Sequence, residues 1–239
     1  MNKQLHLNPP TPGGPESVDI NSLTENGSHA SLFQPKGLVQ FETAWNWQIE
    51  WREKIFRDDS CSQGIWMLEH SPCYTIGRGG DRKNLLFDIN KTPSDFFCID
   101  RGGDATYHSP GQLVVYLVLD LRRYNTDLHW YLRELEQVII DFLSALDIKG
   151  ERVYGLTGVW SKGLKIASIG VGCRRWITQH GFALNINCDL KGFKKILPCG
   201  LNSSKVGKLN DLIPGLTIEE SKSLIKQCLS DRFGFNWSH

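Results

Sequence analysis

The stretch Arg101-Gly-Gly-Asp-Ala-Thr-Tyr-His108-Ser-Pro-Gly-Gln112, which runs into the apolar segment Leu113-Val-Val-Tyr-Leu-Val-Leu-Asp-Leu121, decides the fold of this chain. The apolar segment has the length and composition of a buried strand. The residues before it combine glycines with polar side chains, so they place bare backbone at a sheet edge, where it can lie flat against a ligand. The stretch therefore predicts a binding site beside a central strand.

Further elements are predicted on both sides of this strand. Ala44, Trp47, Trp51 and Ile55 recur at helical spacing, and Leu128 to Leu146 keep their apolar positions on one helical face. The predicted elements are helices over 42–57 and 128–146, strands over 64–69, 96–100, 113–121 and 182–186, a hairpin over 158–169 that turns at 161–163, and a last helix after the capping box at 217–220. Such a mixture predicts an α/β (α+β) fold, in which mixed sheets pack with helices.

Length and charge limit the kinds of function that fit. A chain of 239 residues with 40% hydrophobic residues suits one domain. Residues 1–35, rich in Pro, Gly, Ser and Asn, are expected to form a flexible tail, and residues 36–239 the catalytic domain. Twenty-seven basic and twenty-six acidic residues give no field that attracts nucleic acid or a membrane. With no apolar run of bilayer length, no secretory signal and no marked apolar face, we expect a cytoplasmic monomer.

The cysteines and glycine-rich segments exclude several kinds of site. Seven cysteines stand without a C-x-x-C pair, so neither a disulfide framework nor a metal site is predicted. The segments 77–80, 101–103 and 170–172 match neither the phosphate-loop nor the dinucleotide pattern, because Arg82 and Arg175 stand where a third glycine would be needed. These segments are therefore expected to be loops or parts of a site that does not bind a nucleotide.

Four segments together carry a resemblance to a known family. Residues 101–112, Lys165-Ile-Ala-Ser-Ile-Gly170, His180-Gly-Phe-Ala-Leu-Asn185 and Pro198-Cys-Gly200 resemble the octanoyltransferases of lipoate biosynthesis, and the resemblance covers about residues 38–235. It implies one domain of the lipoate/biotin protein ligase-like fold. It also implies that an octanoyl group passes from octanoyl-acyl carrier protein to a specific lysine of a lipoyl domain, as the first step of endogenous protein lipoylation. The implied acceptors are the lipoyl domains of 2-oxoacid dehydrogenase complexes and the glycine cleavage H protein.

The resemblance also assigns roles to residues. It makes Cys199 the nucleophile that carries the acyl group as a thioester, and it makes Lys165 the residue that sets the ionisation of Cys199. The substrate-binding residues that it implies are Arg101, Gly102, Gly103, Asp104, Ala105, Thr106, Tyr107, His108, Ser168, Ile169, Gly170, Gly181, Phe182 and Ala183. Two departures from the family pattern stand out: Ser109 replaces a usual glycine, and the segment 202–209 after the cysteine is less typical.

Physical chemistry supports a partner for the cysteine. A free thiol with a pKa of about 8.5 is only a few per cent thiolate at neutral pH. An ammonium group about 4 Å away, at an effective dielectric near 20, stabilises the thiolate by about 4 kcal/mol, or roughly three pKa units before desolvation. A thioester is already an activated acyl donor, so no cofactor is expected beyond the phosphopantetheine of the carrier protein.

Alternative interpretations of the same residues stay open at this point. A lysine between Leu164 and Ile166 in a strand more often faces solvent, and a lone cysteine is more often a small buried hydrophobe. His108 and His180 can line the pocket, serve structure, or act as the base for the cysteine. Arg78 and Arg101 are loop cations or help to position the pantetheine. The competing functions are an ATP-dependent lipoate protein ligase and a noncatalytic protein that binds lipoyl domains or acyl chains.

Overall fold

The computed structural model describes residues 28–91, 95–197 and 205–238, which form an eight-stranded sheet, a three-stranded sheet and three α-helices. The large sheet contains β1 (Ser28–Phe33), β2 (Leu38–Val39), β3 (Gln63–His70), β7 (Gln112–Val118), β8 (Val159–Ser161), β9 (Leu164–Arg174), β10 (Ile177–Asn185) and β11 (Phe235–Ser238). The small sheet contains β4 (Cys73–Ile76), β5 (Asp95–Cys98) and β6 (Thr106–His108). The helices are α1 (Phe41–Arg57), α2 (Leu128–Ser144) and α3 (Ile218–Phe233), with short 3₁₀ turns at 82–84, 89–91, 121–123, 190–195 and 209–211.

The large sheet is mixed and has the strand order β11-β1-β3-β7-β10-β9-β8, with β2 paired to the end of β3. Its first strands are parallel, because β1 pairs in this way with both β11 and β3. From β3 through β7, β10 and β9 to β8 every pair is antiparallel. In the small sheet β4 lies between a parallel β5 and an antiparallel β6. The predicted class, mixed sheets packed with helices, is confirmed.

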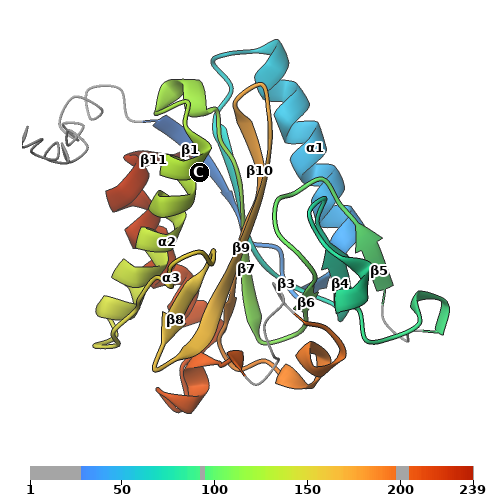
Figure 1. The fold of residues 1–239 in the computed structure, drawn as a ribbon. Coiled ribbons are helices and arrows are strands. Elements are labelled where there is room, and N and C mark those ends of the chain that lie inside the picture. The colour runs from blue at the N-terminus through green and yellow to red at the C-terminus, as the bar shows by residue number, and fades with distance from the viewer. Residues whose placement is uncertain (1–27, 92–94, 198–204, 239) are drawn as a thin grey trace, which may run out of the picture.

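Helices cover both faces of the large sheet. Figure 1 shows α2 and α3 on one side, and α1 with the small sheet on the other. The alternation of β7 explains this, because Val115 and Leu117 belong to the core under α2 and α3, whereas Val114 and Tyr116 belong to the core under α1. A strand that is buried on both faces has apolar residues at every position, as residues 113–119 do.

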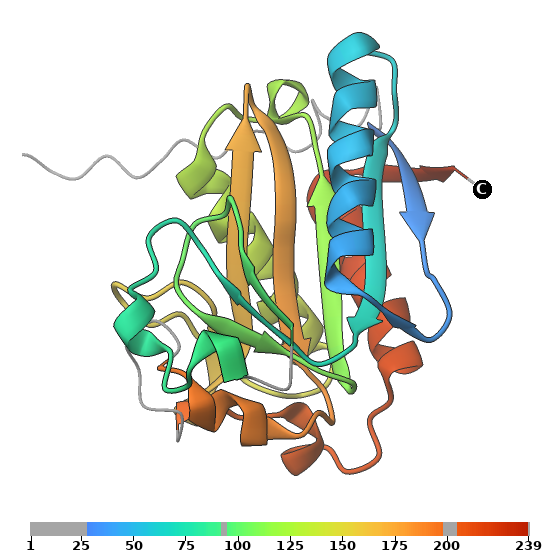
Figure 2. The ribbon, with the colours of Figure 1, turned by 90° about the vertical axis from the view of Figure 1, so that its right-hand side faces the viewer.

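The elements differ from prediction mainly in length and at the chain's first strand. The strands β9 and β10 extend well past the predicted 164–169 and 182–186 and form one long hairpin, which is prominent in Figure 2. Residues 28–33 were assigned to the tail, but they form β1 and pair with β3 and β11. Their pairing depends on strands far along the chain, so local composition gave no sign of it. Residues 1–27 lie outside the described part.

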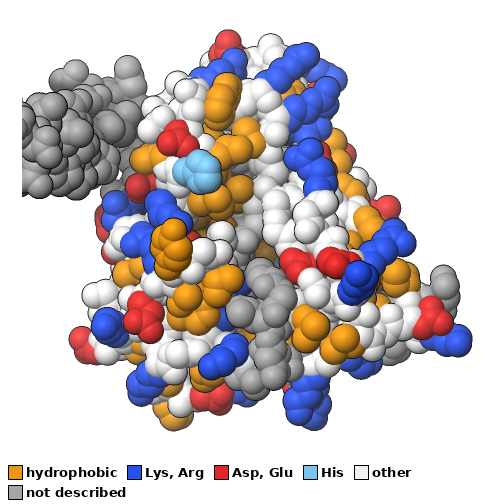
Figure 3. All heavy atoms as spheres, viewed as in Figure 1, with side chains coloured by type: hydrophobic (Ala, Val, Ile, Leu, Met, Phe, Trp, Pro, Cys, Tyr) orange, Lys and Arg blue, Asp and Glu red, His pale blue; other side chains and the backbone are white. Residues whose placement is uncertain are grey.

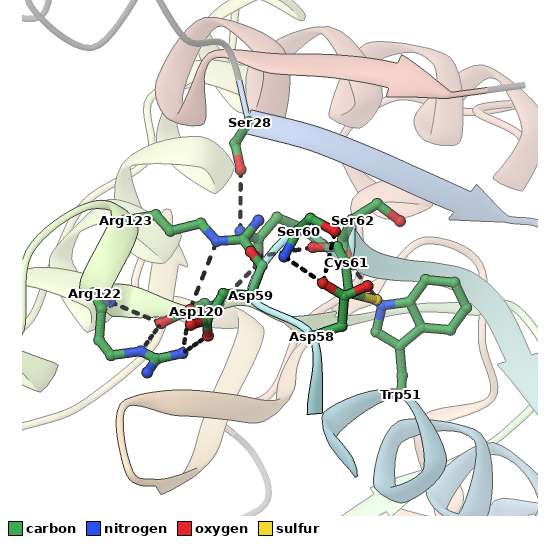
Figure 4. A network of polar contacts seen from close by, with 11 residues as sticks. Ser28, Trp51, Asp58, Asp59, Ser60, Cys61, Ser62, Asp120, Arg122 and Arg123 are labelled. Carbon is green, nitrogen blue, oxygen red and sulfur yellow. Dashed lines mark hydrogen bonds and ion pairs between the residues drawn. The ribbon is translucent and has the colours of Figure 1, made fainter. Parts of the chain in front are cut away.

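A buried carboxylate fixes the end of β7 to the loop that follows α1. Asp120, 2% exposed, accepts hydrogen bonds from Nε and Nη2 of Arg122 at 2.8 and 2.7 Å. Arg123 in turn donates to the carbonyl oxygens of Asp59 and Cys61, the latter at 3.0 Å (Figure 4). Trp51 of α1 donates to the carbonyl of Ser62 at 2.9 Å. This network holds the end of α1 and the loop after it against the large sheet.

Candidate active site

A cavity lies on the α1 face of the large sheet, between strands β7, β9 and β10 and the segment 99–108. It holds about 550 Å³ of empty space, part of it open to solvent. Its lining includes thirteen of the predicted site residues: Arg101, Gly103, Asp104, Ala105, Thr106, His108, Lys165, Ser168, Ile169, Gly170, Gly181, Phe182 and Ala183. Residues from the first and second half of the chain thus meet in one pocket.

Two predicted residues have other surroundings. Tyr107 lies between Thr106 and His108 in β6, so it faces the opposite side of the small sheet. There its ring packs 4.8 Å from that of Tyr74 and 5.7 Å from that of Phe193, centroid to centroid. Tyr107 is therefore not among the residues that line this cavity. Gly102 holds its segment against β9 through its backbone, because its N–H donates to the carbonyl of Val171 at 2.8 Å.

Cys199 falls within residues 198–204, which lie outside the described part of the chain. The described residues on either side of that segment have defined neighbours. Leu197 donates its N–H to the carbonyl of Asn84 at 2.8 Å. Val206 forms a parallel bridge with Lys165, and the N–H of Gly207 donates to the carbonyl of Lys165 at 3.0 Å. The chain that follows the predicted nucleophile therefore returns to the strand that carries Lys165.

Lys165 is buried, although a lysine in a strand usually faces solvent. Only 3% of its surface is exposed, and its Nζ lies 5.2 Å from the ring centroid of Trp160 in β8. Gly158 makes room for it, because a Cβ at that position would lie 2.8 Å from Cε and 3.4 Å from Nζ of Lys165. The φ of Gly158 is +137°, which a residue with a side chain rarely adopts. The backbone before β8 thus packs directly on the lysine.

A second buried carboxylate holds Gly158 in this place. Glu136 of α2 is 1% exposed, and its Oε1 accepts the N–H of Gly158 at 3.2 Å. Its Oε2 accepts from Arg133 at 2.5 Å and from Arg152 at 2.9 Å. A buried charge needs such partners to offset its desolvation. Helix α2 therefore sets the position of the loop that contacts Lys165.

Glycines in β9 allow the segment 100–103 to lie directly on the strand. A Cβ at Gly170 would be 2.9 Å from Cδ of Arg101, and one at Gly172 would overlap the carbonyl oxygen of Asp100. Arg101, 7% exposed, fastens the segment to β4, because its guanidinium donates to the Thr75 hydroxyl at 3.0 Å and to the Asp104 carbonyl at 2.8 Å. Arg78, by contrast, is exposed and paired with Asp100.

Two buried histidines, His108 and His180, line the pocket, and the ring of the buried His70 lies 5.5 Å from that of His108. Burial lowers the pKa of His70 to about 4, and it lowers the pKa of His108 and His180 to about 3. All three rings are therefore neutral at pH 7. A general base works best with a pKa near the operating pH, so this burial argues against His108 or His180 as the base for the cysteine.

Hydrogen bonds fix the tautomers of two of these rings. The Nδ1 of His70 lies 2.7 Å from the carbonyl of Val39, so Nδ1 carries the proton and Nε2 accepts from the Tyr116 hydroxyl at 2.8 Å. The Nδ1 of His108 donates to Oε1 of Gln112 at 2.7 Å. The Gln112 amide then donates to Asn185 at 2.9 Å, and Asn185 donates to the carbonyl of Gly207 at 2.9 Å. This chain of contacts links the pocket to the segment beside Lys165.

His180 has a strained backbone. Its φ is +63°, the left-handed region that non-glycine residues seldom occupy. The regular pairing of β10 with β7 ends at Gly181, next to His180. Beyond it the Thr178 hydroxyl accepts the N–H of Leu119 and donates to the carbonyl of Leu117, both at 2.9 Å. The N–H of His180 donates to Oε1 of Gln48 in α1 at 2.7 Å. Helix α1 therefore holds the bend that turns His180 toward the cavity.

The sequence did not single out four other lining residues: Phe41, Ile99, Val114 and Tyr116. Val114 and Tyr116 follow from the alternation of β7 once one face is known to bear the pocket. Phe41 has no local signal, because its place depends on how α1 packs.

The surface in the view of Figure 3 carries side chains of both charges. Figure 3 shows hydrophobic, acidic and basic side chains interspersed over one face, with Lys and Arg gathered toward α1. Among the described residues no group of His, Cys, Asp and Glu is arranged to hold a metal ion. In the same part of the chain no helix combines the length and hydropathy needed to cross a bilayer.

The chain is similar to known proteins in sequence and in fold. Residues 42–230 match the family model of the lipoyl protein ligase A/B catalytic domain. Octanoyltransferase of Prochlorococcus marinus strain MIT 9211 is 54% identical over 98% of this chain and 100% of its own. Octanoyltransferase of Prochlorococcus marinus strain MIT 9313 is 55% identical over 92% of this chain and 93% of its own.

Two solved structures share the fold. Lipoate-protein ligase A bound with ATP has a TM-score of 0.67 at 15% identity, over 89% of this chain and 87% of that chain. A structure of a bi-partite lipoate protein ligase and its E2 lipoyl domain from Thermoplasma acidophilum has a TM-score of 0.67 at 17% identity, over 89% of this chain and 86% of that chain. At such identities the likeness shows the fold alone.

Proposed function

Because this chain belongs to the lipoyl protein ligase A/B catalytic domain family and is an octanoyltransferase, we propose that it transfers the octanoyl group through a thioester on Cys199, with Lys165 as the partner of that cysteine. The donor is octanoyl-acyl carrier protein, and the acceptor is a lysine of a lipoyl domain, as in 2-oxoacid dehydrogenase complexes and the glycine cleavage H protein. The enzyme acts in the cytoplasm. The observation that carries this proposal is the burial of Lys165 at the cavity, beside the segment that follows residue 199.

In the first step the Cys199 thiolate attacks the thioester carbonyl of the donor. The C–S bond to pantetheine breaks, and the leaving thiolate takes a proton from the cysteine–lysine pair. A lysine ammonium beside the sulfur favours the thiolate, and burial at 3% exposure strengthens that attraction. The acyl chain then occupies the cavity, whose apolar walls include Phe41, Val114 and Ala183.

In the second step the uncharged amine of the acceptor lysine attacks the acyl-enzyme. The amide C–N bond forms, the C–S bond to Cys199 breaks, and neutral Lys165 takes the proton of the amine. The neutral histidines leave Lys165 as the buried base at the pocket, because groups with a pKa of about 3 accept a proton poorly at neutral pH.

Intact-mass spectrometry tests this mechanism. Incubation with octanoyl-acyl carrier protein, without ATP, should add one octanoyl group, which neutral hydroxylamine then removes. Cys199→Ala and Cys199→Ser should lose both the adduct and the transfer. Cys98→Ser, a change at an exposed cysteine of β5, is the matched control and should keep both. Full transfer by the alanine variant would remove covalent catalysis, and a requirement for ATP would favour a ligase mechanism.

A further inference from the structure

The cavity has two different ends. Its lining residues come in rows across the sheet: Ser168 pairs with Ala183, and further along Gly170 pairs with Gly181. Lys165 lies three residues before the first row. Beyond the second row the segment 100–103 rests on β9, through the contact of Asp100 with Gly172 and the hydrogen bond from Gly102 to Val171. The pocket is therefore closed at the end opposite Lys165.

His180 lies at this closed end. It is the antiparallel partner of Val171, it lines the cavity, and it is 3% exposed. Its ring lies edge-on to Tyr116 at 6.0 Å between centroids, and its Cδ2 lies 3.7 Å from the point that a Cβ of Gly172 would occupy. Within the described part of the chain its imidazole makes no hydrogen bond. The strained backbone and the contact with Gln48 thus hold the ring at the closed end of the cavity, where it fills space.

The dimensions of the strand match an acyl chain of the proposed length. Three residues of β9, from Ser168 to Val171, span about 10 Å along the sheet. An extended octanoyl chain, with seven carbon–carbon bonds of about 1.5 Å in zigzag, spans roughly 9 Å from its carbonyl carbon to its methyl group. A chain whose carbonyl lies near Ser168, on the Lys165 side, therefore ends against His180.

We propose that His180 is the end wall of the acyl pocket and the residue that limits the donor to about eight carbons. This inference rests on the proposed function, in which the reacting carbonyl lies at the Lys165 end. The chemistry of the ring suits the role: burial keeps it neutral, so an apolar methyl group can lie against it without stripping water from a charge. His180 thus acts as a specificity-determining residue and takes no part in proton transfer.

His180→Gly tests the wall without straining the backbone, because glycine adopts a φ of +63° freely. Its matched control is Arg175→Gly, which makes the same backbone change at φ +50° in the exposed turn of the same hairpin. A second variant, His180→Asn, keeps a residue that tolerates the left-handed region but shortens the side chain. Hexanoyl, octanoyl, decanoyl and dodecanoyl carrier proteins compete in one reaction, and intact mass of the lipoyl domain reports the products.

Each methylene group that becomes buried favours a donor about fourfold, so two favour decanoyl over octanoyl by about fifteenfold. We expect the decanoyl-to-octanoyl product ratio to rise on that order in His180→Gly, to rise less in His180→Asn, and to stay unchanged in Arg175→Gly. All donors compete for the same enzyme molecules, so partial unfolding does not alter the ratio. An unchanged ratio in His180→Gly would overturn the proposal. Failure of the Cys199 mechanism would leave this ratio measurable, so the two tests are separate.

Discussion

Replacing Gly158 by alanine tests whether the packing of β8 against Lys165 matters for catalysis. The new Cβ would lie 2.6 Å from the Ala167 carbonyl oxygen and 2.8 Å from Cε of Lys165, closer than real side chains approach. Alanine also disfavours a φ of +137°, at a cost on the order of 1–3 kcal/mol. For a chain of this size such a loss lowers the melting temperature by several degrees.

The contact predicts a further loss of activity. The alanine methyl group can be accommodated only if the Lys165 side chain or the loop moves, and a displacement near 1 Å at a reacting group costs on the order of a hundredfold in rate. We therefore expect single-turnover octanoyl transfer, measured per folded molecule, to fall about a hundredfold. Alkylation of Cys199 by iodoacetamide at neutral pH should slow as well, because the ammonium group would no longer lie where it favours the thiolate.

Gly155→Ala is the matched control. Gly155 also has a positive φ, +76°, but a Cβ there would meet nothing within 4 Å. It should lose stability by a similar mechanism and keep its transfer rate per folded molecule. If Gly158→Ala transferred octanoyl as fast as Gly155→Ala, the packing against Lys165 would have no catalytic role.

Three further predictions follow from the charges and the chain ends. Lys165→Ala should shift the alkylation of Cys199 to higher pH, whereas Lys165→Arg should preserve alkylation and lose amide formation. An unchanged alkylation profile in the alanine variant would refute the pairing of Lys165 with Cys199. The pKa values of the buried His70, His108 and His180 lie below the value near 6.5 of an unfolded chain. The free energy of unfolding should therefore fall as the pH drops from 6.5 toward 4, by about 1.4 kcal/mol per pH unit for each ring. A melting temperature that stays flat from pH 7 to 4.5 would contradict this. Removing residues 1–27 should leave both activity and melting temperature unchanged, and a large loss of activity would show that this segment serves the site.

The sequence predicted those elements of the fold that residues close together in the chain determine. The helix spacing at Ala44 to Ile55 and the capping box at Thr217 identified α1 and α3, because periodicity and capping depend on residues only a few positions apart. Strand β1 was missed because its neighbours, β3 and β11, lie more than thirty and two hundred residues away. The three-residue strand β6 was also missed, and with it the alternation that turns Tyr107 away from the pocket.

In the candidate site, too, some features could be predicted from the sequence and others depend on distant contacts. The segment 101–112 was singled out by its glycines and polar residues, and the segments 165–170 and 180–185 by the resemblance to octanoyltransferases. Residues of all three segments line one cavity. Phe41 and the bend at His180 had no local signal, since His180 takes its unusual φ from a contact with Gln48, which is 132 positions away. The burial of Lys165 likewise depends on Gly158 and Glu136, which neither composition nor spacing connects to it.

The close contact between Asp100–Gly103 and the glycines of β9 also limits how this enzyme can evolve. A Cβ at Gly172 would overlap the Asp100 carbonyl oxygen, and one at Gly170 would press on the Arg101 side chain, so substitutions of these two glycines can obstruct the pocket but cannot enlarge it. Room for a different donor must come from trimming side chains that line the cavity, such as His180, Phe41 and Tyr116. Natural drift and directed evolution should therefore reach new acyl specificities through few positions, and libraries that randomise the glycine segments should yield mostly inactive clones.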